Sequence, residues 1–274
     1  MYCNPSRRDA LKLLGTGALT ATVLRAADPP KFHAVDHVGL TVADSKKAAA
    51  FYARLFGPTV YKEKMNERRY VRVGPCYISL APPAVNQPAN YRVDHVCPGV
   101  EPFDIPALEA YLKSQDVAFR HTEDFGPFIP DPDSISIQWW TWNSWPPTIK
   151  TSAAEPPPST GAPIFQATGM DHILLQVPDP EKSTAFYAKL FGPVVQRAAN
   201  RIWFQVGASR IGLSSTPSGQ RPGVNHFCVA AAKFDRAEAV RQLQQAGAAV
   251  QTGEAANDIQ FRDPDGVLVQ VMTM

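Results

Sequence analysis

The chain has 274 residues, of which 45% are hydrophobic and 19% are charged, and its formal net charge is +2. A chain of this length forms one large domain or two ordinary ones, and its composition supports a packed core and excludes global disorder. The near-neutral charge and the lack of a long basic run argue against nucleic acid as a partner.

The N-terminal segment has the pattern of an export signal. Arg7 and Arg8 precede an apolar run from Leu13 to Leu24, which small residues follow. This is the order of regions in a secretory signal, and the run is too short to span a bilayer comfortably. The paired arginines resemble a twin-arginine signal, although Ala10 stands where an aromatic residue is usual. We expect residues 1–27 to be removed during export to the periplasm or the medium, leaving no stable membrane anchor.

An internal repeat organises the rest of the chain. Asp36–Leu40 and Phe51–Pro58 recur 135 positions later as Asp171–Leu175 and Phe186–Pro193. Self-similarity of this kind determines architecture, so we expect two homologous halves. Three shorter segments also have counterparts in the second half: His95–Cys97 in His226–Cys228, Asp131–Asp133 in Asp263–Asp265, and Gln138 in Gln270.

Each half is itself doubled. A dipeptide ending in histidine opens four apolar, β-branched runs that are typical of strands, and a helical pattern follows each run. The four dipeptides are Asp36-His37, Asp94-His95, Asp171-His172 and Asn225-His226. The predicted unit is one strand, one helix and about three strands, which makes an α+β chain of four tandem βαβββ modules.

The ends of two helices are predicted from single residues. Asp44 and Asp179 are good N-caps, and proline at the first helical position suits the second of these helices. Gly57-Pro58 and Gly192-Pro193 end the helices. The short strand-like runs that follow are Tyr70–Val73, Cys76–Leu80, Trp203–Val206 and Arg210–Leu213.

A proline-rich stretch separates the halves. Residues 145–168 combine several prolines with Ser, Thr and Ala, which is a linker composition. The sequence therefore predicts a first domain over residues 32–144 and a second over residues 169–274.

These features together resemble the vicinal-oxygen-chelate superfamily, which includes glyoxalase I, extradiol dioxygenases, fosfomycin-resistance transferases and bleomycin-binding proteins. The resemblance rests on tandem βαβββ modules, Asp-His at the first strand, Phe-Tyr-x-x-Leu-Phe-Gly on the helix and Asp-Pro-Asp before the last strand. It implies curved mixed sheets around a cavity, with the helices outside. The fold hosts unrelated chemistries, so it does not by itself identify a reaction.

The resemblance also implies a metal site in each half, at positions that supply ligands in metal-using members of the superfamily. Three ligands on separate strands leave positions of a divalent Fe, Mn, Zn or Ni ion open for substrate. The positions are His37, His95 and Gln138 in the first half and His172, His226 and Gln270 in the second. Active members usually carry Glu where this chain has Gln, so the predicted donor set lacks an anionic ligand.

The acids and cysteines close to the histidines are not predicted to be metal ligands. Because neighbours on a strand point to opposite faces, we do not expect the acids preceding the histidines to act as ligands. Cys97 and Cys228 share a face with His95 and His226, and we interpret both thiols as small buried residues. After signal removal three cysteines remain, Cys76, Cys97 and Cys228. This odd number implies no disulfide framework, although one pair could form in an oxidising compartment.

Ordinary chemistries of the superfamily fit the sequence poorly. Ring-cleaving dioxygenases carry a tyrosine where this chain has Phe128 and Gln260, and glyoxalase I needs carboxylates that Ile78–Leu80 and Ile211–Leu213 do not supply. We therefore predict a Lewis-acid site that chelates adjacent oxygens of a small substrate, in dioxygenase-like or glyoxalase- or lyase-like chemistry.

Two alternatives stay open. The chain could be a metal-free small-molecule binder of the bleomycin-resistance type, with tryptophans 139, 140, 142 and 145 stacking on a flat ligand or packing under the linker. Alternatively, one half is active and the other is structural. The sequence is compatible with a monomer or a homodimer.

Overall fold

The computed structural model describes residues 28–84, 90–123, 125–146, 151–156, 161–198, 200–251 and 257–273. The predicted export signal, residues 1–27, lies outside these described residues. Within them, no helix combines the length and the apolar character needed to cross a membrane.

The first half contains two consecutive βαβββ modules, as predicted. Its elements are β1 (Phe32–Thr41), α1 (Ser45–Phe56), β2 (Val60–Glu63), β3 (Arg69–Val73), β4 (Cys76–Ala81), β5 (Arg92–Val100), α2 (Ile105–Ser114), β6 (Phe128–Pro130), β7 (Ser136–Gln138) and β8 (Trp140–Thr141).

The second half repeats this order of elements. They are β10 (Ala167–Val177), α3 (Pro180–Phe191), β11 (Val194–Ala198), β12 (Arg201–Val206), β13 (Ser209–Ser215), β14 (Gly223–Ala231), α4 (Arg236–Gln245), β15 (Ala249–Gln251), β16 (Asp258–Arg262) and β17 (Leu268–Thr273). The predicted α+β class is confirmed.

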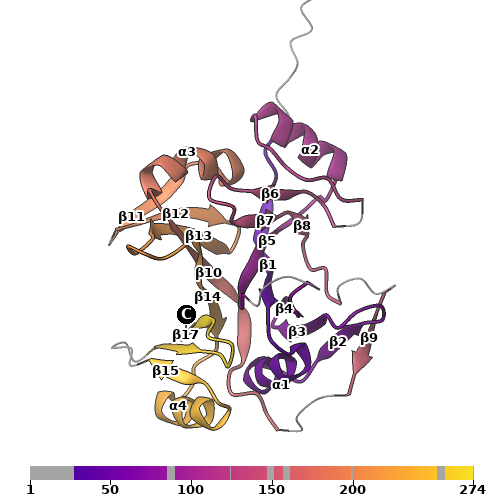
Figure 1. Ribbon diagram of the computed structural model, residues 1–274, viewed down its shortest axis with the longest axis vertical. Coiled ribbons are helices and arrows are strands. Elements are labelled where there is room, and N and C mark those ends of the chain that lie inside the picture. The colour runs from indigo at the N-terminus through magenta and orange to yellow at the C-terminus, as the bar shows by residue number, and fades with distance from the viewer. Residues whose placement is uncertain are drawn as a thin grey trace, which may run out of the picture.

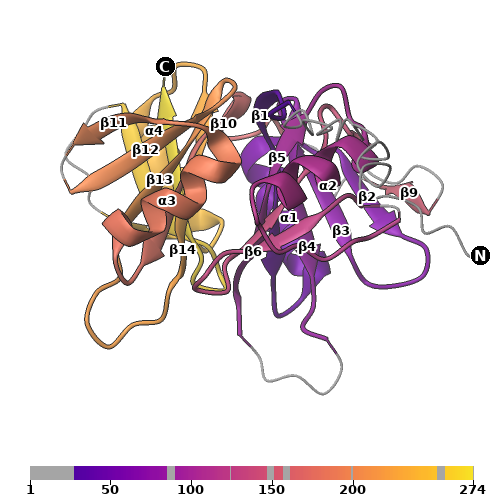
Figure 2. The ribbon, with the colours of Figure 1, turned by 90° about the horizontal axis from the view of Figure 1, so that it is seen from above.

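Each half builds one mixed sheet, and the two sheets lie side by side (Figure 2). In the first sheet β1 pairs antiparallel with β5 and parallel with β4, and in the second β10 pairs in the same way with β14 and β13. The opening strands of the modules therefore occupy the centre of each sheet. Side chains near the middle of β1 therefore lie close to those of β5, and side chains near the middle of β10 lie close to those of β14.

The helix caps confirm the residues predicted for them. Asp44 accepts hydrogen bonds from two backbone N–H groups in the first turn of α1, and Asp179 does the same for α3. These bonds satisfy donors that a helix start leaves without partners. Gly192 follows α3 with φ of +84°, a conformation that residues with a side chain rarely adopt.

Part of the predicted linker belongs to the first sheet. Residues Ser152–Glu155 form β9, which pairs antiparallel with β2 at the sheet edge. Arg69 fixes this strand by donating from Nε to a carboxylate oxygen of Glu155 at 2.9 Å. The connection between the halves is therefore structured over these four residues.

The repeated helix and turn motifs contact each other across the halves. The Tyr52 hydroxyl of α1 donates to Asp263 at 2.7 Å, and the Tyr187 hydroxyl of α3 donates to Asp131 at 2.7 Å. Accordingly, α1 lies near α4, and α3 lies near β6 and β7 (Figure 1). Burial raises the pKa of both aspartates. One apolar core, containing Phe51, Phe227 and Phe261 among others, runs through both halves.

Candidate metal centre

The first-half histidines come from neighbouring strands and point into one space. His37 lies on β1 and His95 on β5, and both are almost fully buried, with exposed fractions of 4% and 5%. Gly39 pairs with His95 across the strands. A Cβ atom at Gly39 would lie 2.1 Å from the His95 ring, so this position has to be glycine for the ring to lie where it does.

A β-bulge brings each preceding acid to its histidine. The register of β1 against β5 skips Asp36 on one strand and Asp94 on the other. A bulged residue does not follow the alternation of a regular strand. The Asp36 and Asp94 carboxylates consequently lie 3.0 Å from Nδ1 of His37 and His95, respectively. The alternation argument was wrong about where these acids point, although neither is placed as a ligand.

The carboxylates determine which nitrogen of each ring carries the proton. A carboxylate accepts hydrogen bonds, so Nδ1 is the protonated nitrogen of each neutral imidazole and Nε2 carries a lone pair. Burial lowers the pKa of His37, which keeps that ring neutral. The Nε2 atoms of His37 and His95 lie 3.3 Å apart. Two lone pairs therefore face each other at close range, an arrangement that a shared cation relieves.

Gln138 on β7 completes the first set. Its amide NH₂ group donates to the Phe125 carbonyl at 2.7 Å, and the side chain lines the same cavity as His37 and His95. Because the NH₂ group is committed to Phe125, the Oε1 atom is the one that faces the histidines. Oxygen is the amide atom that binds a divalent cation.

The two histidine nitrogens fit a divalent transition metal. Two nitrogens that each lie ~2.1 Å from one ion are about 3.0–3.4 Å apart at octahedral or tetrahedral angles. The observed separation of 3.3 Å falls within this interval. A carboxylate on the second ring nitrogen is the usual support of a metal-binding histidine. The residues present thus fit the metal that the fold family implies, with a donor set that carries no charge.

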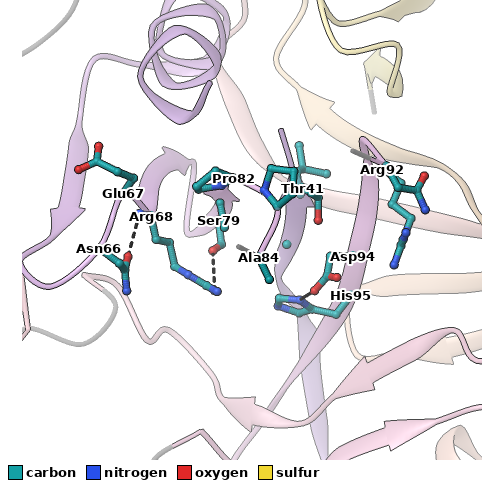
Figure 3. Close-up of a pocket in the computed structure, with 15 residues that line it drawn as sticks. Thr41, Asn66, Glu67, Arg68, Ser79, Pro82, Ala84, Arg92, Asp94 and His95 are labelled. Carbon is teal, nitrogen blue, oxygen red and sulfur yellow. Dashed lines mark hydrogen bonds and ion pairs between the residues drawn. The ribbon is translucent and has the colours of Figure 1, made fainter. Parts of the chain in front are cut away.

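A cavity of about 460 Å³ opens at this donor set. Aromatic side chains form much of its wall, including Tyr77, which stacks on His37 with ring centroids 4.4 Å apart. A second cavity of about 350 Å³ adjoins it and shares Arg68, Ser79 and His95 with it. Figure 3 shows Arg68 and His95 on facing sides of this smaller cavity, with the Arg68 guanidinium directed to Ser79. A ligand can therefore approach the histidines from either space.

The second-half set is assembled in the same way, within its own sheet. The Nε2 atoms of His172 and His226 lie 3.1 Å apart, and the Asp171 carboxylate contacts Nδ1 of His172. Gln270, on the strand that pairs with the strand of His226, donates its NH₂ group to Asp258 at 2.8 Å. All six predicted residues therefore occupy two sets of three, and each set forms inside one half.

One hydrogen-bond partner differs between the sets. Nδ1 of His226 faces the amide Oδ1 of Asn225 at 2.7 Å, whereas Nδ1 of His95 faces a carboxylate. Both oxygens accept a hydrogen bond, so Nδ1 carries the proton in both rings. The neutral amide supports the ring less strongly than a carboxylate does.

Two further side chains fill the second site. Trp203 occupies the position of Tyr70, and its indole lies within 2.6 Å of where a Cβ atom at Gly212 would be. Gly212 corresponds to Ser79, which lines the first-half cavity. Arg210 occupies the position of Tyr77 and donates to Asp171 at 3.2 Å. A guanidinium beside the donor atoms opposes the binding of a dication.

The cysteines behave as buried, protonated thiols. Cys76, Cys97 and Cys228 are all free, and burial raises the pKa of Cys97 and Cys228 well above the usual range. Cys228 lies close to Asp171 and His172, so that the three could hold an ion. A thiol that keeps its proton is a poor metal ligand.

The tryptophan cluster divides among several sites. Trp139 is fully buried in the core, whereas Trp140 lines the larger cavity. Trp142 stacks on His33, and Trp145 contacts Tyr61 and Tyr77. Only Trp140 of the four lies on that cavity wall.

Comparisons with known proteins agree with the fold. Residues 169–271 match the family model described as Glyoxalase/Bleomycin resistance protein/Dioxygenase superfamily. The match covers most of the second half and less than half of the whole chain. No curated protein sequence matches the chain.

Solved structures extend the likeness to both halves. Homoprotocatechuate 2,3-dioxygenase from Arthrobacter globiformis is 16% identical with a TM-score of 0.66, covering 91% of this chain and 82% of that one. The Brevibacterium fuscum enzyme in complex with 3,4-dihydroxyphenylacetate is 15% identical with a TM-score of 0.66, at 91% and 83% coverage.

A third similar structure is a xylose isomerase-like TIM barrel/4-hydroxyphenylpyruvate dioxygenase fusion protein, 12% identical with a TM-score of 0.64. The match covers 93% of this chain and 51% of that protein, so the chain spans about half its length. At these identities the likeness shows the fold.

Sequence reasoning did not find the residues that distinguish the sites. Asn225 departs from the Asp-His pattern in the sequence, but its contact with His226 depends on a β-bulge that the sequence does not show. Arg68 was not among the predicted site residues, yet it lines the cavity. Trp203 and Arg210 carried no signal, because their effect depends on the cross-strand register.

Proposed function

We propose that the first half binds a divalent transition metal through His37, His95 and Gln138, and that the protein is a metal-dependent enzyme. Its substrate is a small molecule that chelates the metal through two adjacent oxygens. The proposal is carried by one observation: two carboxylate-supported histidines present facing Nε2 atoms 3.3 Å apart at a cavity of about 460 Å³.

The protein's own groups have defined roles in this proposal. When bound, the metal supplies Lewis acidity that polarises the substrate oxygens. Asp36 and Asp94 hold the imidazoles with Nε2 available, and Phe125 orients the Gln138 amide. Tyr77 stacks on His37 and limits its movement. With neutral donors only, the metal keeps its full positive charge for the substrate. Oxygen insertion, isomerisation and lysis are all compatible with this arrangement.

Elemental analysis tests the metal site. Wild-type protein loaded with Fe, Mn, Ni or Zn and then desalted should retain about one metal ion per chain. His37→Ala should lose it, and His172→Ala, the matched change in the second half, should keep it. If His37→Ala retained the metal and His172→Ala lost it, the metal site would lie in the second half. Failure of the wild type to bind any of the four metals would overturn the proposal.

A metal-free binder is the second candidate, and the aromatic wall formed by Tyr77, Phe128 and Trp140 favours it. Such walls hold flat ligands by stacking. The same elemental analysis separates the two candidates, because a binder of this kind retains its ligand without metal.

We also propose that the protein is exported through its N-terminal segment. This proposal rests on the twin-arginine pattern of residues 1–27 alone. Replacing Arg7 and Arg8 by lysine should keep the protein in the cytoplasm, as measured by cell fractionation and by the mass of the N-terminus. Unchanged export of the double variant would contradict it.

A further inference from the structure

Two arginines on the wall of the larger cavity have no carboxylate partner among the contacts of the described residues. Arg68 donates from Nη1 to the Ser79 hydroxyl at 3.4 Å, which is a long and weak hydrogen bond. The Arg120 guanidinium lies over the Phe128 ring, 4.5 Å from its centroid. Both charged groups therefore face a space in which a ligand can reach them.

The adjacent Arg69 shows what a structural arginine looks like in this fold. It is buried, and it donates to the carboxylates of Glu67 and Glu155. Its charge is neutralised within the protein, and it ties β9 to the sheet. Arg68 differs, because the side-chain partner of its guanidinium among the described residues is the neutral Ser79.

The charges on the cavity wall do not balance. Glu63, which accepts a hydrogen bond from the Tyr70 hydroxyl at 2.7 Å, is the one acid that lines this cavity among the described residues. Two guanidinium groups line the same cavity, and the Asp94 carboxylate lines the adjoining one. The donor set of His37, His95 and Gln138 adds no negative charge, and a bound dication would increase the excess of positive charge.

We infer that the ligand of this cavity is a small carboxylic acid, whose negative charge is met by Arg68 and Arg120. Guanidinium groups are well suited to carboxylates, because their planar donors match the two oxygens. The inference deepens the proposed function and rests on it for the position of the chelating end of the ligand. The excess of arginine charge on the wall is present with or without a metal.

A matched pair of probes tests this inference. 3,4-Dihydroxybenzoate and 4-methylcatechol both carry two adjacent oxygens on a ring and differ by a carboxylate in place of a methyl group. Binding is measured by isothermal titration calorimetry, with Zn-loaded and metal-free protein. We expect the acid to bind about tenfold more tightly or better, since a charge-assisted hydrogen bond contributes at least that much.

Single variants assign this preference to the two residues. Arg68→Gln and Arg120→Gln should each weaken binding of the acid severalfold and leave the neutral probe unaffected, while Arg68→Lys should retain part of the preference. Arg201→Gln is the matched control, because Arg201 has the place of Arg68 in the second half, and it should change neither affinity.

The outcomes separate this inference from the proposed function, because metal content is measured on the same samples. Bound metal with equal affinity for the two probes would overturn the acid inference alone, as would a preference that survives both Gln substitutions. Absence of metal with the preference intact would overturn the metal proposal alone. Binding of neither probe at millimolar concentration would overturn the inference in both forms of the protein.

Discussion

The two halves present the same histidine pair on the same strands, with Nε2 atoms 3.3 Å apart in the first half and 3.1 Å apart in the second. Their surroundings differ at several corresponding positions, three of which bear directly on the histidines. Asp94, Tyr77 and Tyr70 of the first half are replaced by Asn225, Arg210 and Trp203 in the second, as the strand registers show.

Each replacement acts against a metal by a different physical route. Asn225 gives His226 a neutral amide in place of a carboxylate, Arg210 places a positive charge at Asp171 beside the pair, and Trp203 fills the space that a ligand would use. Donor atoms alone therefore do not define a metal site. The family model matches the second half, whereas the features that favour a metal and a substrate lie in the first.

The first prediction tests whether the Trp203 side chain fills the second site. Trp203→Ala should lower the free energy of unfolding by about 3–5 kcal/mol, because it removes a buried aromatic side chain and leaves a void. Urea denaturation measures this, and added indole should restore part of the stability. Trp140→Ala, at the open cavity of the first half, should cost clearly less. Equal losses from the two variants would contradict the contrast between a filled and an open site.

The second prediction concerns acid. Burial, with the charges of His172 and Arg201, lowers the pKa of His226 to about 3. The unfolded chain binds a proton on this residue below about pH 6.5, whereas the folded chain does not until about pH 3. Proton uptake by His226 therefore does not favour unfolding above about pH 6.5. As pH falls below about 6.5, the free energy of unfolding decreases by up to about 1.4 kcal/mol per pH unit.

Urea denaturation of metal-free protein between pH 7 and pH 4 measures this loss. His226→Gln should show a shallower dependence of stability on pH. Some dependence should remain, because burial also lowers the pKa of His37. A variant with the slope of the wild type would show that His226 is not the residue that resists protonation.

The third prediction exchanges the residues that support the histidines at Nδ1. Asp94→Asn gives the first half the partner found in the second, so that Nδ1 of His95 faces a neutral amide instead of a carboxylate. Metal affinity should fall about 10–100-fold, as it does when the support of a ligand is lost. Competition with a chromophoric chelator measures this. Asn225→Asp, the reciprocal change, should leave the first-half affinity unchanged; an unaltered affinity in Asp94→Asn would refute the role of the carboxylate.

The smallest effect tests what the halves share. Tyr52→Phe and Tyr187→Phe each remove one hydrogen bond of 2.7 Å to a buried aspartate of the other half. Each should lower the free energy of unfolding by about 1 kcal/mol, and by similar amounts, because the partner aspartates keep their backbone hydrogen bonds. Clearly unequal losses would mean that the two contacts are not equivalent.

The sequence predicted what depends on local or repeated pattern. The caps at Asp44 and Asp179 and the order of elements followed from residue types, and the repeat indicated two equivalent halves. Both histidine–glutamine sets were named by resemblance, and the structure brings their members together. The linker prediction missed β9, since Ser152–Glu155 lacks a strand-like pattern of its own and pairs only with an edge that β2 provides.

The difference between the sites was beyond local pattern. It arises from bulges that turn Asp36 and Asp94 toward the rings, and from cross-strand neighbours that are far apart in the sequence. Trp203 lies opposite Gly212, so its effect on the site depends both on the register of the two strands and on the absence of a side chain at Gly212. Neither can be predicted from single residues of the sequence.

The reciprocal contacts of Tyr52 with Asp263 and of Tyr187 with Asp131 have a consequence for the history of the chain. Two copies of a single half, arranged about a two-fold axis, would make both contacts as one self-complementary interface. Once the copies are joined, a substitution in this interface weakens both halves, whereas one at His172 or Trp203 alters a single site. Duplication therefore leaves the interface under constraint in both copies and frees one of the two pockets to change.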